Sequence, residues 1–101
     1  MYGYIAKINA KPGERDALLA ILLEGSTGMA GCIGYVVAED QDNMDAVWVT
    51  EVWESEAAHA ASLQLPSVKA AIAKAMPLIA GFEPLAQTTP RGGIGLPVVG
   101  R

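Results

Sequence analysis

The chain has 101 residues, of which 51% are hydrophobic, and its formal net charge is −4. This length predicts a single domain with a core of its own. The basic residues are scattered, so the sequence lacks the positive footprint that nucleic-acid phosphates require. It also lacks the roughly 20 consecutive apolar residues of a membrane span and the basic start and apolar run of a secretory signal.

The single cysteine, Cys32, has no partner for an internal disulfide, which is typical of a reducing compartment. We therefore expect a cytoplasmic protein with neither a nucleic-acid nor a membrane partner. We interpret Cys32 as a small buried residue at a strand start, because no base that would activate its thiol is evident. A small chain this apolar often shares its core with a second copy, so we expect a homodimer.

The first half of the chain predicts a strand, a helix and a strand. Residues 2–9 alternate between two faces as a β-strand does, and residues 11–13 (Lys-Pro-Gly) form a turn. Residues 14–25 carry leucine and isoleucine at helical spacing, and residues 33–39 predict a second strand. The polar run 40–43 predicts a solvated hairpin loop, because it lacks the spaced ligands of a calcium-binding EF-hand.

The second half predicts a third strand followed by two helical segments. Residues 45–54 are apolar on both strand faces, so both faces need cover. Ser55 stands where a helix N-cap would be, and the helix is expected over residues 55–65. Pro66 suits the first turn of a second helical segment, which Pro77 ends or kinks.

Residues 82–89 predict the last strand, and Pro84 favours an edge or bulged position because it withholds a hydrogen-bond donor. The order β-α-β-β-α-β is typical of the ferredoxin-like α+β fold, an antiparallel sheet with helices on one face. Pairing of two copies through the second sheet face is the simplest way to cover it. We assign residues 1–89 to this domain. Residues 90–101 form a Gly-rich apolar tail that we expect to dock on the partner subunit.

A strand end and a helix start meet between Trp53 and His59, and any site is expected at this corner. Histidine ordinarily titrates near neutral pH, but a partly exposed helix histidine without a role and a purely structural tryptophan are the alternatives. Glu51 shares a strand face with Trp53; facing inward it needs a partner or a raised pKa, and facing solvent it has no role. Tyr4 and Tyr35 are further candidates for a pocket wall, where each buried hydroxyl would need a partner.

Residues 51–81 (EVWESEAAHAASLQLPSVKAAIAKAMPLIAG) resemble the antibiotic biosynthesis monooxygenase (ABM) family, and within it the quinol monooxygenases. Residues 11–13, 31–35 (Gly-Cys-Ile-Gly-Tyr) and 89–92 (Thr-Pro-Arg-Gly) extend the resemblance over nearly the whole chain. It implies a dimeric ferredoxin-like α/β barrel with a pocket between sheet and helices in each subunit. It also implies oxidation of phenolic rings or quinols by O₂ without metal, flavin or haem.

The resemblance implies that Trp53 is an aromatic pocket wall and that His59 is a base or proton relay. It also marks differences. Quinol-oxidising relatives carry histidines where this chain has Ser62 and Ser67. Val49 stands where the polyketide-ring members have a polar asparagine.

Haem-degrading relatives use an Asn, a Trp and a His near the positions of Ala6, Ser62 and Ile72. None of those residue types is present there, so haem degradation is not expected. The predicted catalytic residues are His59 and Trp53, no metal or cofactor is expected, and the predicted substrate pocket comprises Tyr4, Tyr35, Val49, Glu51, Ser62 and Ile72.

We expect a cofactor-independent monooxygenase that oxidises a small phenolic or quinol substrate with O₂. Two alternatives remain open. One is a non-catalytic dimeric module that binds a small ligand, which the missing polar positions favour. The other is an isomerase or lyase that acts on an aromatic acid or lactone, because one fold hosts many functions.

Overall fold

The structure is a computed structural model that describes residues 1–97. Its elements follow one another as β1 (Tyr2–Ala10), α1 (Arg15–Gly25), β2 (Cys32–Glu39), β3 (Ala46–Trp53), α2 (Glu56–Ser62), α3 (Pro66–Ala75), the 3₁₀ helix η1 (Met76–Leu78) and β4 (Ile79–Thr88). The strands form one antiparallel sheet in the order β2-β3-β1-β4. The ferredoxin-like α+β prediction is confirmed.

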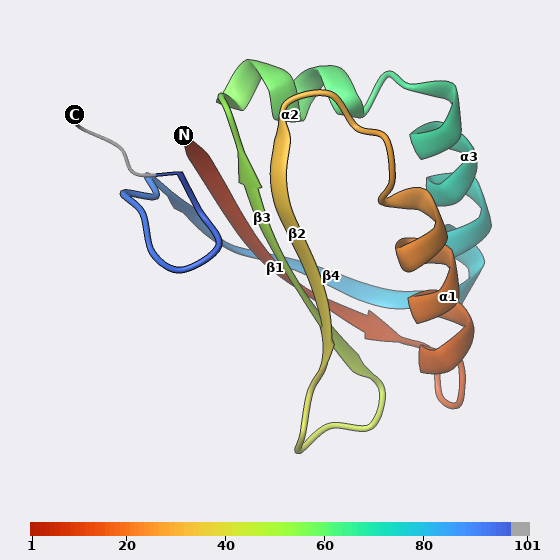
Figure 1. The fold of residues 1–101 in the computed structure, drawn as a ribbon. Helices are drawn as coiled ribbons and strands as arrows, with labels where there is room; N and C mark the ends of the chain where they lie inside the picture. Colours follow the sequence, from red (N-terminus) through yellow and green to blue (C-terminus); the bar gives the residue numbers. More distant parts are fainter. Residues whose placement is uncertain (98–101) are drawn as a thin grey trace.

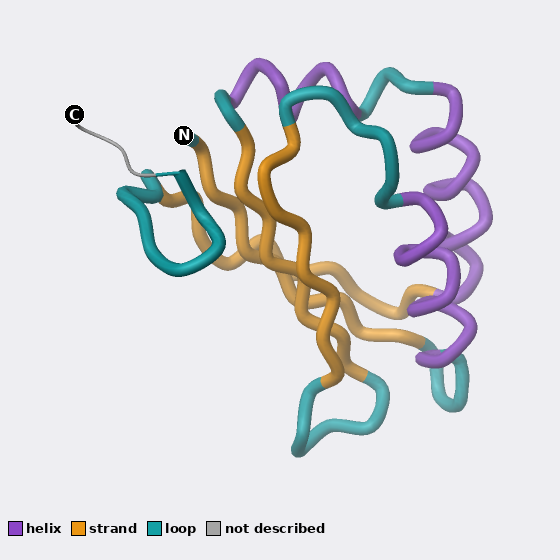
Figure 2. Tube along the Cα trace, in the orientation of Figure 1, coloured by secondary structure: helices purple, strands orange, loops and turns teal. Residues whose placement is uncertain are grey.

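All three α-helices lie on the same side of the sheet (Figure 1). Helices α1 and α3 run side by side, whereas α2 lies across the end of the sheet where β3 stops (Figure 2). No helix in the described part of the chain is long and apolar enough to cross a membrane.

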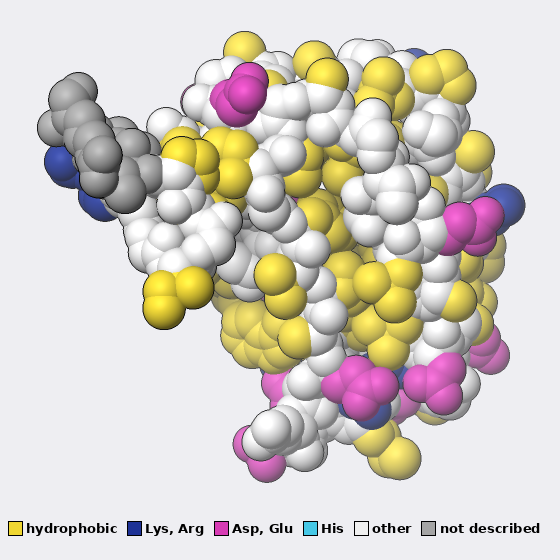
Figure 3. Space-filling view, in the orientation of Figure 1, with side chains coloured by type: hydrophobic (Ala, Val, Ile, Leu, Met, Phe, Trp, Pro, Cys, Tyr) yellow, Lys and Arg dark blue, Asp and Glu magenta, His cyan; other side chains and the backbone are white. Residues whose placement is uncertain are grey.

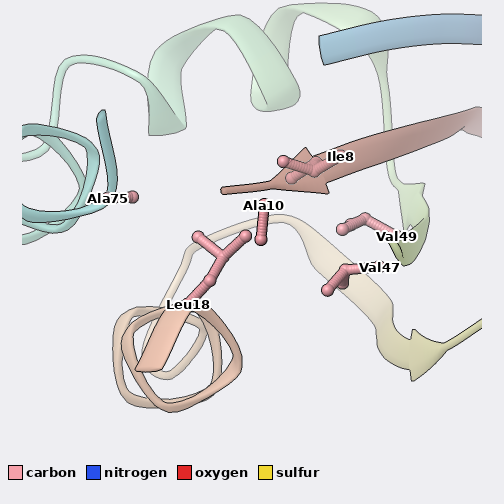
Figure 4. Packing of buried hydrophobic residues seen from close by; sticks show 6 residues of the cluster. All are labelled: Ile8, Ala10, Leu18, Val47, Val49 and Ala75. Atoms are coloured by element: carbon pink, nitrogen blue, oxygen red, sulfur yellow. The ribbon is translucent and has the colours of Figure 1, made fainter. Parts of the chain in front are cut away.

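The main core lies between α1 and the sheet, at the end away from α2. Leu18 of α1 is fully buried and packs with Ile8 of β1 and Val47 of β3 (Figure 4). Full burial of such an aliphatic side chain stabilises the fold by roughly 1.5–3 kcal/mol. This core anchors α1 at one end of the sheet, and three of its members, Ile8, Val49 and Ala75, also line the cavity of the candidate site.

Local sequence signals explain the ends of the second and third helices. The Ser55 hydroxyl accepts a hydrogen bond from the Ala58 N–H at 3.1 Å, so the predicted N-cap is confirmed. The predicted helix over 55–65 is too long, because α2 ends at Ser62. The residue before a proline avoids helical geometry, and Leu65 is indeed extended (φ −66°, ψ 134°) ahead of Pro66.

Strand β4 begins at Ile79 rather than at the predicted residue 82, because η1 finishes the helical segment at Leu78. Its pairing with β1 shifts register as Pro84 aligns with Ala6 and Ala86 with Ile5, which leaves Leu85 as a bulge. Because β4 pairs only with β1, the prediction of an edge or bulged strand is confirmed.

Cys32 begins β2 as predicted, but it is only partly buried. Burial raises the pKa of its thiol, and a nearby carboxylate, Glu51, raises it further. The thiol therefore stays protonated at neutral pH, which opposes a nucleophilic role.

Within residues 1–97, no helix covers the second face of the sheet (Figure 1). Alternation along the strands places Ile5, Val36, Trp48 and Val52 on this face, and Val36 is 59% exposed. The tail begins at this face, where Pro90 packs over Gly3. A Cβ atom added to Gly3 would lie only 3.1 Å from the ring of Pro90. Val98 and Val99 of the tail lie outside the described residues.

Candidate functional site

A cavity of about 680 Å³ lies between the helix-covered face of the sheet and the helices. Figure 3 shows hydrophobic side chains gathered around this hollow. The polar groups that reach it are few, and they come from Tyr4, Tyr35, Glu51, His59 and Ser62. The site is therefore an apolar chamber with one polar region, as expected for a small-molecule site.

Strand register brings three of these polar residues into one row. Glu51 at the centre aligns with Tyr4 of β1 on one side and with Tyr35 of β2 on the other. The next row that faces the helices, away from α2, is apolar and contains Val49, paired with Ala6. Polarity thus changes along the sheet, from the end beneath α2 toward the end beneath α1 and α3.

Glu51 is a buried carboxylate, with only 9% of the residue exposed. Its Oε1 atom accepts a hydrogen bond from Trp53 Nε1–H at 2.9 Å. Burial raises the pKa of Glu51, while this hydrogen bond and the nearby His59 oppose the rise. Of the two possibilities that the sequence left open, the inward orientation is confirmed.

His59 stands directly beside this carboxylate. Its Nε2 atom lies 3.8 Å from Glu51 Oε1, and its side chain is 18% exposed. Three aromatic rings surround the imidazole at centroid distances of 5.3 to 5.5 Å, those of Tyr2, Tyr4 and Trp53. The Ser55 cap begins the helix one turn earlier, which aims His59 down at the sheet. The corner predicted from the sequence is therefore present.

Trp53 has a different place from the one predicted. It is 1% exposed and does not line the cavity, so it is not an aromatic wall. Because it ends β3 on the face that α2 covers, its ring lies edge-on behind His59 and its N–H holds Glu51. Trp53 is thus a positioning residue for the two polar groups in front of it.

The remaining predicted pocket residues, Tyr4, Tyr35, Val49, Ser62 and Ile72, all line the cavity. Burial raises the pKa values of Tyr4 and Tyr35, most strongly that of Tyr35. Both hydroxyls therefore stay protonated and can donate a hydrogen bond to a ligand. The Ser62 hydroxyl, by contrast, donates at 2.6 Å to the carbonyl oxygen of His59 in its own helix.

Sequence reasoning missed Tyr2 and most of the apolar wall. Tyr2 shares a strand face with Tyr4, which alternation revealed, but its contact with His59 depends on how α2 lies across the sheet. The unpredicted wall includes Ile21 and Leu22 of α1 and residues after Leu65, such as Val68, Met76 and Phe82. The helical spacing of apolar residues was the available signal, but it does not distinguish a core from a cavity.

No group of three or more His, Cys, Asp and Glu side chains in residues 1–97 is arranged to hold a metal ion. In the polar loop 40–43, Asp40 Oδ1 accepts hydrogen bonds from the backbone N–H groups of Asp42 and Asn43, so this oxygen stabilises the turn.

Comparison with known proteins assigns the family. The model of the family "Antibiotic biosynthesis monooxygenase" matches residues 1–74. The chain belongs to the ABM family. No functionally curated protein matches it.

Solved structures agree with this family membership. The chain is similar to a candidate antibiotic biosynthesis monooxygenase from Chloroflexus aurantiacus J-10-fl, with 55% identity, a TM-score of 0.88 and coverage of 91% of this chain and 94% of that one. A protein from Pseudomonas aeruginosa shares 22% identity with a TM-score of 0.78, covering 88% and 92%. One from Deinococcus radiodurans, described as a candidate ABM enzyme, shares 23% identity with a TM-score of 0.73, covering 99% and 100%. The two more distant likenesses show the ABM fold alone.

Proposed function

We propose that this ABM protein is a cofactor-independent monooxygenase that oxidises a phenol or hydroquinone with O₂. The observation that carries the proposal is the buried Glu51 carboxylate, which has a raised pKa and stands 3.8 Å from His59 at the polar end of an apolar cavity. A buried base with a raised pKa is the group that deprotonation of a weak acid at neutral pH requires.

The first step is proton transfer. The substrate hydroxyl occupies the polar end of the cavity, where the Glu51–His59 pair accepts its proton. The Tyr4 and Tyr35 hydroxyls, which line the same region, donate hydrogen bonds to the developing phenolate. The apolar walls exclude water and so strengthen these interactions.

The second stage is oxygen transfer, and the substrate supplies every electron. The phenolate passes one electron to O₂, and the resulting ring radical and superoxide join through a new C–O bond. The peroxide takes back the proton held by Glu51 and His59. Loss of the ring C–H proton and of hydroxide then gives a ring carbonyl and water. One oxygen atom enters the product and the other leaves as water, so the atoms balance without a cofactor.

A non-catalytic ligand-binding module is the second candidate, and the state of Ser62 favours it. Its hydroxyl is engaged within α2, and Val49 offers no polar group, so the cavity has few donors beyond the two tyrosines. An isomerase or lyase would use the same Glu51 base without consuming O₂, which makes oxygen uptake the discriminating measurement.

We further propose that a second copy of the chain covers the open sheet face and that the tail after residue 89 docks on the partner. We also propose a cytoplasmic location, because Cys32 would stay reduced there. The apolar side chains of Ile5, Val36, Trp48 and Val52 on that face support self-pairing. Light scattering should give twice the mass of one chain. Val36→Asp should yield monomers, and a monomeric wild type would refute the pairing.

The function is tested with an oxygen electrode. Purified protein treated with a chelator should accelerate O₂ uptake in the presence of hydroquinones, and His59→Ala should reduce that acceleration. The proposal fails if no phenol or hydroquinone changes O₂ uptake. Binding without oxygen uptake would support the ligand-binding module, and product formation under nitrogen would support the isomerase or lyase.

A further inference from the structure

The outer part of the cavity is lined by large hydrophobic side chains that are also exposed. Leu63 is 43% exposed, Ile72 45%, Met76 60% and Phe82 52%, and each of them lines the cavity. Exposed apolar side chains that cluster around a cavity mark a binding surface rather than random surface composition. We call these four residues the apolar rim.

The apolar rim and the polar row belong to different elements. The row Tyr4–Glu51–Tyr35 lies on three strands beside His59 of α2. The rim comes from the segment after α2, from α3 and η1, and from the edge strand β4. The residues between them, such as Val49 and Ala75, are buried and apolar.

A single-ring substrate would occupy only part of this space. The volume of about 680 Å³ lies within the roughly 300–1,000 Å³ typical of sites for drug-sized ligands. The remaining walls offer almost no hydrogen-bond partner, so polar substituents placed there would lose their hydration without compensation. The part of the ligand beyond the ring must therefore be apolar.

We infer that the substrate is an amphipathic hydroxyarene: a phenol or hydroquinone ring that carries an extended alkyl or prenyl substituent. The ring hydroxyl lies between Glu51, His59 and the two tyrosines, and the substituent lies over Val49 and Ala75 and leaves past the apolar rim. The position of the ring rests on the proposed function, whereas the position of the substituent rests on the rim alone. The inferred ligand keeps the phenolic or quinol ring expected from the sequence and adds an apolar substituent to it.

The chemistry of the rim favours a flexible chain. Met76 has a flexible, unbranched side chain that packs against varied shapes, and the rim is open to solvent on one side, so the end of a long chain need not fit inside. Burial of a methylene is worth about 0.8 kcal/mol, which corresponds to roughly fourfold in affinity. Because the rim is half exposed, we expect about threefold per methylene, levelling off once the chain passes Met76.

The test is isothermal titration calorimetry under nitrogen with 2-alkylhydroquinones whose substituents run from methyl to decyl. Affinity should rise about threefold per methylene over the first several. Met76→Gln should reduce this dependence and weaken the binding of decylhydroquinone more than that of methylhydroquinone. Met44→Gln is the matched control, because Met44 is 78% exposed but lies away from the cavity, and it should behave as the wild type does.

The inference is overturned if affinity does not depend on chain length. That result is expected if a second subunit covers the rim. The inference is also overturned if Met76→Gln weakens methylhydroquinone as much as decylhydroquinone. Tighter binding of a fused-ring hydroquinone than of any alkyl member would replace the chain with a rigid polycyclic body. Binding under nitrogen requires no oxidation, so a chain-length dependence without O₂ uptake would refute the proposed function and keep this inference.

Discussion

Strand β3 carries two tryptophans on opposite faces of the sheet, and each donates its indole N–H to a carboxylate. Trp48 Nε1 lies 2.7 Å from Asp40 Oδ2, and Trp53 Nε1 lies 2.9 Å from Glu51 Oε1. The two carboxyl groups nevertheless respond in opposite directions. The hydrogen bond from Trp48 is the largest influence on the pKa of Asp40 and lowers it, whereas burial dominates at Glu51 and raises its pKa.

The surroundings, not the donor, make the difference. Asp40 is solvent-accessible, accepts two further backbone hydrogen bonds and lies near Lys7, which together favour its charged form. Glu51 lies beneath α2, and the imidazole of His59 stands 3.8 Å from its Oε1 atom. The same indole–carboxylate pair thus accompanies a lowered carboxyl pKa on the open face and a raised carboxyl pKa on the covered face.

The largest expected effect separates the two carboxylates. Glu51→Gln should lower the rate of O₂ uptake by about 100-fold or more, the range lost with a general base, because Gln keeps the hydrogen bond from Trp53 but cannot take a proton. The matched change Asp40→Asn should leave the rate within about twofold. Steady-state oxygen consumption checks both variants, with circular dichroism as the folding control. Equal losses in both would mean that burial does not distinguish them.

Removal of the imidazole should have a smaller effect. His59→Phe keeps an aromatic ring among Tyr2, Tyr4 and Trp53 but leaves Glu51 without its imidazole neighbour. We expect kcat to fall roughly 10- to 100-fold, which lies at or below the low end of the losses on removing an acid–base group, with the thermal midpoint little changed. Full activity in this variant would show that Glu51 acts alone.

The tryptophans can be compared through the pH dependence of kcat/KM. Glu51 must be deprotonated to act as a base, so activity should rise with pH through its raised pKa. Trp53→Phe removes an interaction that lowers this pKa, so the acidic limb should move to higher pH. Trp48→Phe should leave the limb in place. If both tryptophan variants shifted the acidic limb of the pH profile, or if neither did, the assigned role of Trp53 would be wrong.

The smallest effect is on stability. The pKa of Glu51 is raised in the folded state above its unfolded value, so folding favours the protonated form. The protonated carboxyl's contribution to stability is fully present below the unfolded pKa and is lost as pH rises through the folded pKa. Glu51→Gln should therefore unfold at a higher temperature than the wild type at neutral pH, and the difference should shrink on acidification. A difference that does not depend on pH, measured by thermal melts, would contradict the burial of a charge.

The sequence predicted the strand side of this site well, because strand alternation is local information. The residues 47, 49, 51 and 53 fell on one face by counting alone, and the Ser55 cap fixed where the next helix begins. The row Tyr4–Glu51–Tyr35 needed strand register, which depends on pairs far apart in the chain.

The full extent of the cavity wall could not be predicted from the residue pattern. Apolar residues of α3 such as Val68 read as ordinary core, and only the space between α3 and the sheet shows that they line a cavity. The role of Trp53 was missed for the same reason. A strand pattern says that a side chain faces inward, but not whether it meets a ligand or stands behind the residues that do.

Isotope labelling shows directly whether an atom of O₂ enters the product. The protein should be incubated with an alkylhydroquinone under ¹⁸O₂, and the quinone product analysed by mass spectrometry against Glu51→Gln and Asp40→Asn. We expect one ¹⁸O atom in the product formed by wild type and by Asp40→Asn, and only background labelling with Glu51→Gln. An unlabelled quinone formed with hydrogen peroxide would mean that the protein merely promotes electron transfer to O₂, and it would contradict a monooxygenase.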